Sequence, residues 1–201
     1  MSAKTSICVH ISVSILLLAA LTGCGKTEPS VSGSVDKEVA ITIDSLVSQA
    51  AAGNIDNVRL LIKGSINVND KNSLGSTPLV DAAWNGRRDV VMLLLDEKAD
   101  INGANTNFMT PIFAAVSQKH EDVSITLLER GANANLANSS GVVPLMEAAW
   151  QGNSKLVSLL VTKGANVNYK NPKDSASALS LARAADQQET VKTLQELGAK
   201  E

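Results

Sequence analysis

The sequence predicts an all-α solenoid of about five similar helix–turn–helix units. First, Pro78, Pro111 and Pro144 recur in similar phrases with a constant 33-residue step, and a fixed period of this size is typical of stacked repeats. Second, the aliphatic residues inside each unit recur at the helical period of about 3.6 residues. Third, the chain is 44% hydrophobic but has only two Phe, two Trp and one Tyr. Its core must therefore be aliphatic, which favours helices over sheets.

Residues 1–23 carry the pattern of a signal peptide. Lys4 precedes a mostly apolar run from Ile7 to Leu21, which is shorter than the roughly 20 residues that a membrane span needs. The run ends in Leu21-Thr22-Gly23-Cys24, which resembles the lipobox of bacterial lipoproteins. That resemblance implies cleavage before Cys24 and attachment of lipid to its thiol. The alternative is an ordinary secretory signal with a chance cysteine.

A lipidated Cys24 would anchor the mature chain to a bacterial membrane. Acyl chains contribute about 0.8 kcal/mol per buried CH₂, and two chains are enough for stable anchoring. Gly25 follows the cysteine, where lipoproteins of Gram-negative bacteria often have an Asp that retains them at the inner membrane. The resemblance therefore implies an outer-membrane protein that faces the periplasm, with surface display as the alternative. Residues 24–40 are polar and are expected to form a flexible tether with a reach on the order of 20–25 Å.

The remaining residues, 41–201, are organised as repeats. Asn102, Asn135 and Asn168 follow the same step as the prolines, and Trp84 and Trp150 stand two such steps apart. A fainter unit precedes the three clear ones, and another follows them after one inserted residue. This pattern resembles the ankyrin repeat over about four-fifths of the chain. The expected repeats cover about residues 41–74, 75–107, 108–140, 141–174 and 175–201.

Local residue preferences agree with two helices in each repeat. A Pro at the first helical position loses no hydrogen bond, and Thr77 and Thr110, which precede two of the prolines, can cap the helix. Small alanines keep the first helix slim, whereas the second helix carries Val and Leu on one face. A glycine then stands where the second helix ends in a left-handed residue. These glycines are Gly131, Gly164 and Gly198.

The chain departs from the ankyrin pattern at two kinds of position. Lys98 stands where the later repeats have the helix-ending glycine, and a positive φ there should cost about 1 kcal/mol. The histidine that usually follows Thr-Pro-Leu is also missing, so apolar packing must replace its hydrogen bond in the middle repeats. The residues at this position are Val80, Phe113, Met146 and Ser180.

Composition and motifs argue against nucleic-acid binding, metal binding and catalysis. The net charge of −2 offers no basic surface for nucleic acid. Cys8 and Cys24 are the only cysteines, and both precede the repeats. His120 is the one histidine after Cys24 and occupies the position that opens a second helix. A catalytic triad or a zinc site with three or four ligands is therefore not expected. We expect no enzyme activity, no metal, no cofactor and no small-molecule substrate.

The ankyrin resemblance implies a binding surface on the concave side of the repeats, where the first helices and the hairpin tips are exposed. Asp81 with Trp84, and Glu147 with Trp150, are i, i+3 pairs, so acid and indole share one helix face. The alternative is that each Trp packs along its neighbouring helix. The predicted helix residues are Asp81, Trp84, Asn85, Ala114, Ser117, Gln118, Glu147, Trp150 and Gln151. The predicted apolar residues of the hairpin tips include Leu74, Met109 and Val142.

Together these features favour a membrane-anchored protein that binds another protein. By resemblance to other lipid-anchored ankyrin proteins, the most specific hypothesis is an immunity or inhibitor protein that neutralises a toxin acting in the periplasm. The alternative is a structural or assembly scaffold for another envelope protein. A toxin or secreted-effector gene beside this one would favour the first hypothesis.

Overall fold

The computed structural model describes residues 41–200, which form ten α-helices within that range. The predicted signal peptide, Cys24 and the tether lie outside the described residues. One antiparallel bridge, between Lys170 and Ser177, is the only β pairing in the described range. The prediction of an all-α repeat fold is therefore confirmed. The helices are α1 (Ile43–Ala52), α2 (Ile55–Lys63), α3 (Pro78–Trp84), α4 (Arg88–Asp96), α5 (Pro111–Ser117), α6 (Glu121–Glu129), α7 (Pro144–Trp150), α8 (Ser154–Thr162), α9 (Ala178–Ala184) and α10 (Gln188–Glu196).

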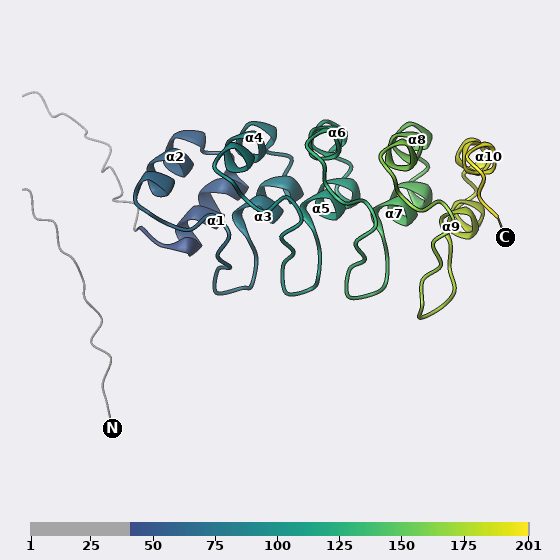
Figure 1. Ribbon diagram of the computed structural model, residues 1–201, viewed down its shortest axis with the longest axis horizontal. Helices are drawn as coiled ribbons and strands as arrows, with labels where there is room; N and C mark the ends of the chain where they lie inside the picture. Colours follow the sequence, from purple (N-terminus) through teal and green to yellow (C-terminus); the bar gives the residue numbers. More distant parts are fainter. Residues whose placement is uncertain (1–40, 201) are drawn as a thin grey trace, which may run out of the picture. The chain divides into compact units, whose positions relative to one another are not determined.

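The helices of the repeat domain lie in two layers (Figure 1). The first helices of the pairs, α1, α3, α5, α7 and α9, stand side by side in one row, and each packs against the next. The second helices form the other row in the same order. Between successive pairs, a long hairpin loop projects on the side of the first helices. The first helices and the hairpins therefore make one continuous surface.

The first helices begin where capping residues predict. Thr77 accepts a hydrogen bond from the Val80 amide, and Thr110 accepts one from the Phe113 amide. A proline occupies the first turn of α3, α5 and α7, where the missing N–H has no helical partner to lose. Val143 precedes α7 and provides no side-chain cap. Helix α7 therefore begins without one of the hydrogen bonds that α3 and α5 have.

The second helices end in the left-handed conformation, as predicted from their glycines. Gly131, Gly164 and Gly198 have φ of 90°, 92° and 90°. Lys98 adopts φ of 68° at the same register, which is the positive φ for which the cost was predicted, and Ser65 in the first repeat adopts φ of 67°. Two of the five repeats thus end their second helix with a residue that disfavours this conformation.

The core runs along the solenoid between the two helix layers. Alanines of the first helices, such as Ala82 and Ala115, are fully buried, which allows neighbouring helices to pack closely. Val80, Phe113 and Met146, at the position of the missing histidine, are 0%, 7% and 1% exposed. Apolar packing therefore does replace the polar side chain in the three middle repeats.

Asparagine side chains join the hairpin bases of neighbouring repeats. The Oδ1 atoms of Asn69, Asn102, Asn135 and Asn168 each accept a hydrogen bond from a backbone amide about one repeat further on, at 2.7–2.9 Å. These bonds recur at every junction, so they set the spacing of one repeat from the next. They also explain why Asn recurs with the same period as Pro.

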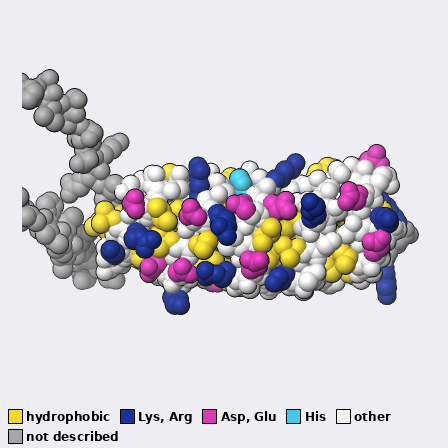
Figure 2. Space-filling model, turned by 90° about the horizontal axis from the view of Figure 1, so that it is seen from above, with side chains coloured by type: hydrophobic (Ala, Val, Ile, Leu, Met, Phe, Trp, Pro, Cys, Tyr) yellow, Lys and Arg dark blue, Asp and Glu magenta, His cyan; other side chains and the backbone are white. Residues whose placement is uncertain are grey.

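The second-helix face carries charges of both signs. Figure 2 shows Lys and Arg side chains interspersed with Asp and Glu over this face, with small apolar areas between them. It does not form a single-sign field of the kind that attracts nucleic acid. Among residues 41–200, no helix is both long and apolar enough to cross a membrane.

Candidate partner-binding surface

Trp84 and Trp150 are partly exposed at the ends of α3 and α7. Their exposed fractions are 39% and 49%, whereas the preceding alanines, Ala83 and Ala149, are fully buried. Large apolar side chains are usually more buried than this in a well-packed core. Both indoles therefore have surface left to bury against a partner.

The carboxylates that were predicted to share the face of each Trp hold local structure. Ser76 Oγ donates a hydrogen bond of 2.6 Å to Asp81 Oδ1, which ties the first hairpin to α3. The Gln151 amide donates a bond of 2.8 Å to Glu147 Oε1. Asp81 and Glu147 are half-buried, so each presents only part of its carboxylate to solvent. Their charge can act on a partner while their positions are set by neighbours in the chain.

Gln151 also joins the fourth repeat to the third. Its Nε2 lies 3.1 Å from the carbonyl oxygen of Val116 and 3.3 Å from that of Ser117, and donates to both. Both oxygens belong to the last turn of α5, where the Val116 carbonyl also accepts from the Lys119 amide at 3.0 Å. The donors of Gln151 are thus already used within the protein, so its Oε1 is the atom that a partner could still contact.

The predicted positions of the third repeat differ in their exposure. Ala114 is 0% exposed, so the prediction that it belongs to the exposed positions is wrong. It packs between the neighbouring first helices because a methyl group lets them approach closely. Ser117 is half-buried and its hydroxyl donates to the Ala114 carbonyl, whereas Gln118 is exposed. Asn85, the counterpart of Gln118 on α3, is exposed but bonds the Asp81 carbonyl at 2.8 Å.

The comparison with protein families agrees with this architecture. A family model described as ankyrin repeats (3 copies) matches residues 42–105 and 102–171. The chain belongs to the ankyrin-repeat family. Among curated proteins, none matches the chain. Ankyrin repeats are protein-interaction modules, so the fold indicates a protein-binding function. Among the described residues, no cluster of three or more His, Cys, Asp or Glu side chains could hold a metal ion.

The ankyrin hairpins expose a different apolar set from the one predicted. Met109 and Val142 are half-buried and pack against the core, because they directly precede the capping residues of α5 and α7. Both were predicted to contribute apolar surface at the hairpin tips, and each keeps only part of its side chain exposed; their contact with a partner stays a prediction. Leu74 is 84% exposed, in agreement with its predicted place. Phe108 is 65% exposed and was not predicted. Its register could have revealed it, since Phe108 stands one repeat after Gly75 and one repeat before Gly141.

The first hairpin is held against α1. The amide and the hydroxyl of Ser73 both donate to Asp44 Oδ1, at 3.0 and 2.6 Å. These two hydrogen bonds favour the ionised carboxylate and lower the pKa of Asp44 below its ordinary value. Asp44 therefore keeps its negative charge beside the tip that carries Leu74.

His120 has a structural place in this ankyrin domain. It is the N-cap residue of α6, and its Nε2 lies 3.1 Å from the carbonyl oxygen of Trp84. A carbonyl oxygen only accepts, so the proton of the ring is on Nε2 in this bond. Its place at the junction of the second and third repeats is consistent with the expectation that it opens a second helix.

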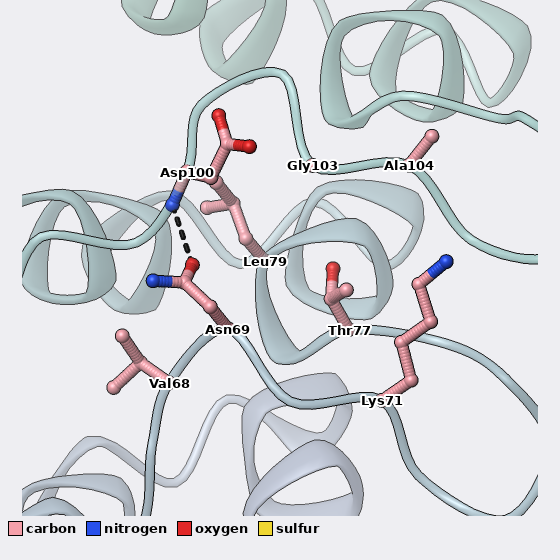
Figure 3. A pocket seen from close by; sticks show the side chains of 8 residues that line it. All are labelled: Val68, Asn69, Lys71, Thr77, Leu79, Asp100, Gly103 and Ala104. Atoms are coloured by element: carbon pink, nitrogen blue, oxygen red, sulfur yellow. Dashed lines mark hydrogen bonds between the residues drawn. The ribbon is translucent and has the colours of Figure 1, made fainter.

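A hollow of about 260 Å³ lies between the first two hairpins, beside the Asn69–Asp100 hydrogen bond (Figure 3). Gly103 borders it, and the residues at the corresponding position of the next two repeats are Leu136 and Tyr169, both half-buried. The hollow thus exists where one repeat has a glycine instead of a larger side chain. Its lining contains none of the predicted contact residues. It is formed by Val68, Asn69, Lys71, Thr77, Leu79, Asp100, Gly103 and Ala104.

Proposed function

We propose that this protein is a lipid-anchored ankyrin protein of the bacterial envelope that binds a protein partner on the surface of its first helices. Two partly exposed tryptophans, Trp84 and Trp150, carry this proposal. They end first helices two repeats apart, so both lie on the same row of helices. A rigid aromatic side chain buries much area at a small entropy cost, and Trp is enriched among the residues that dominate interface energies.

The charge around the tryptophans suits a partner with basic residues. Asp81 and Glu147 each stand one helical turn before a Trp and are held by hydrogen bonds from Ser76 and Gln151. A carboxylate that is already positioned loses little side-chain entropy on binding. It is expected to affect mainly the association rate and the salt dependence of binding.

The anchor part of the proposal rests on the lipobox-like phrase that ends in Cys24. Residues 25–40 would then separate the repeats from the membrane surface, on the outer membrane and facing the periplasm. Within this location, the most specific role is that of an immunity or inhibitor protein that covers part of a toxin. A scaffold for another envelope protein would use the same surface.

Metabolic labelling with a fatty acid tests the anchor. The parent protein should incorporate label, and Cys24→Ala should incorporate none and remain unprocessed, because the thiol is the site of attachment. Cys8→Ala is the matched control, since Cys8 lies within the predicted signal peptide and its loss should leave labelling unchanged. Equal labelling of the parent and Cys24→Ala would contradict the lipoprotein assignment.

A deletion strain separates the two roles. An immunity protein should be dispensable in pure culture, but its loss should sensitise cells to neighbours that deliver the matching toxin, and restoration of the gene should protect them. The control is the gene with both Trp84→Ala and Trp150→Ala, which should restore protein but not protection. A deletion that depletes another envelope protein in pure culture would instead indicate the scaffold.

A further inference from the structure

The hairpins of the first three repeats expose two large apolar side chains at adjacent tips. Leu74 is 84% exposed and Phe108 is 65% exposed. The corresponding tips further along the domain carry the polar residues Ser140 and Asp174. Among the hairpins of the described residues, strongly exposed Leu or Phe side chains therefore occur on the first two.

Phe108 occupies a backbone conformation that disfavours it. Its φ is 56°, in the left-handed region, and the residues at the same position of the neighbouring hairpins are Gly75 with φ of 75° and Gly141 with φ of 80°. A bulky residue at positive φ is a genuine outlier, whereas glycine adopts this conformation without penalty. Because Phe108 is also largely exposed, folding gains little from its side chain. A strained and exposed aromatic residue is of the kind that binding surfaces retain.

The two tips are held together. The Thr106 amide donates to the Gly75 carbonyl at 3.0 Å, and the Thr106 side chain fills the space beside Gly75, where a Cβ would lie 2.2 Å from its Cγ2. Leu74 precedes Gly75 directly, and Phe108 follows Thr106 by two residues. The backbone of the two tips is therefore already joined before a partner arrives, which reduces the entropy cost of binding.

The surroundings of these tips are acidic. Asp44 and Asp81 bond the serines on either side of the Leu74–Gly75 tip, through Ser73 and Ser76. Membrane association of exposed apolar residues normally relies on neighbouring Lys and Arg to attract anionic lipids. An acidic border instead complements a cationic protein segment. This part of the surface comprises α1, α3, α5 and the hairpin segments 66–77 and 99–110. Its one basic residue is Lys71, and its acidic residues are Asp44, Asp70, Asp81 and Asp100.

We infer that Leu74 and Phe108 are the apolar anchors of the partner-binding surface, and that they hold a positively charged, amphipathic segment of a protein. Apolar side chains of that segment contact Leu74 and Phe108, and its Lys or Arg side chains face Asp44 and Asp81. The inference rests on the proposed function, because it takes the partner to be a protein. It goes further by adding the first two hairpin tips to the surface that carries Trp84 and Trp150, and by stating the charge of the partner segment that these tips hold.

Photo-cross-linking tests this placement in cells that produce the protein, grown alone and mixed with neighbours that deliver the matching toxin. A benzophenone amino acid replaces Phe108 in the full-length chain, and the matched control replaces Ser175, which has φ of 61° and is exposed on the last hairpin. We expect a protein adduct at 108 but not at 175, through a peptide that has apolar residues and a net positive charge. Equal adducts at both positions, adducts with lipid alone, an acidic peptide, or no adduct would each overturn the inference.

A second probe at Gln118 separates this inference from the proposed function. Gln118 is exposed on the surface of the first helices, away from the hairpin tips. A partner captured at 118 but not at 108 leaves the proposed function standing and removes the inference. Capture at neither position removes both.

Phe108→Gly then tests how much the Phe108 side chain contributes to partner binding, and it should do so without destabilising the fold. It should raise the melting temperature, because glycine relieves the positive φ, and it should lower capture by the probe at 118 by about tenfold or more. Ser175→Gly is the matched control, which should raise the melting temperature and leave capture unchanged. Asp44→Asn with Asp81→Asn should lower capture most strongly at low salt. Unchanged capture by Phe108→Gly would overturn the anchor role.

Discussion

The carbonyl oxygen of Trp84 lies 3.1 Å from Nε2 of His120, so a residue of the candidate surface is bound through its backbone to the next repeat. Arg87 makes the equivalent contact one repeat earlier, where its Nε donates to the Ala51 carbonyl at 3.0 Å. Such contacts satisfy carbonyl groups at the end of a short helix and connect neighbouring repeats. The backbone at Trp84 is therefore held by a residue of the following repeat, far from it in the sequence.

Gly86 should be intolerant of a side chain because of this contact. Its φ is 67°, and a Cβ would lie 2.5 Å from Nδ1 of His120. Gly86→Ala should therefore cost more than the roughly 1 kcal/mol of the positive φ alone. His120→Ala removes the obstructing ring, so the double variant should lose less stability than the sum of the two single variants, by about 0.5–3 kcal/mol. Denaturant unfolding of the four proteins measures this coupling. Additive losses would show that the ring does not restrict Gly86.

The start of α7 can be strengthened by a cap. Val143 is 2% exposed and stands where Thr110 caps α5, so Val143→Thr should place a hydroxyl near the Met146 amide. The expected gain in the free energy of unfolding is about 0.5–2 kcal/mol. Thr110→Val is the reciprocal control and should lose a similar amount. Thermal or denaturant unfolding checks both variants, and a loss of stability in Val143→Thr would mean that the new hydroxyl is buried without its bond.

Lys98 should be replaceable by glycine with a gain in stability. Its φ of 68° matches the register of Gly131, whose φ is 90° and whose Cβ would meet nothing within 4 Å. Lys98→Gly should therefore stabilise the domain by about 1 kcal/mol, and Gly131→Ala should destabilise it by about the same amount. Both changes leave the packing of side chains unaltered, so the comparison measures the cost of a positive φ in a residue that has a Cβ. If the two variants shifted the melting temperature in the same direction, the positive-φ explanation would be wrong.

Trp84→Ala and Trp150→Ala distinguish binding from packing. With 39% and 49% of these side chains exposed, each change should cost about 1–2 kcal/mol of stability, less than the roughly 3–5 kcal/mol of a buried aromatic residue. Each should weaken partner binding by about 2 kcal/mol or more, which is roughly thirtyfold. Thermal melts and titration calorimetry on the same preparations measure both effects. Large melting losses with unchanged affinity would assign the indoles to packing.

The amino-acid sequence by itself determined the repeat register and the ends of most helices. Thr77, Thr110 and the prolines after them mark where helices begin, because capping and φ restriction act within one turn. Gly131 and Gly164 mark where helices end for an equally local reason. The sequence also located Trp84 and Trp150 on the first helices, since their position follows from the register alone.

Only the tertiary structure decided which of these side chains remain available. Ala114 is covered by neighbouring first helices. The side-chain amide of Gln151 donates its hydrogen bonds to carbonyl groups about one repeat earlier. Met109, which was predicted to lie at a hairpin tip, packs against the core. Each outcome depends on atoms roughly a repeat away in the chain, brought close by stacking. The periodicity of the sequence cannot predict those contacts, because the exposure and hydrogen bonding of a side chain depend on how neighbouring repeats pack.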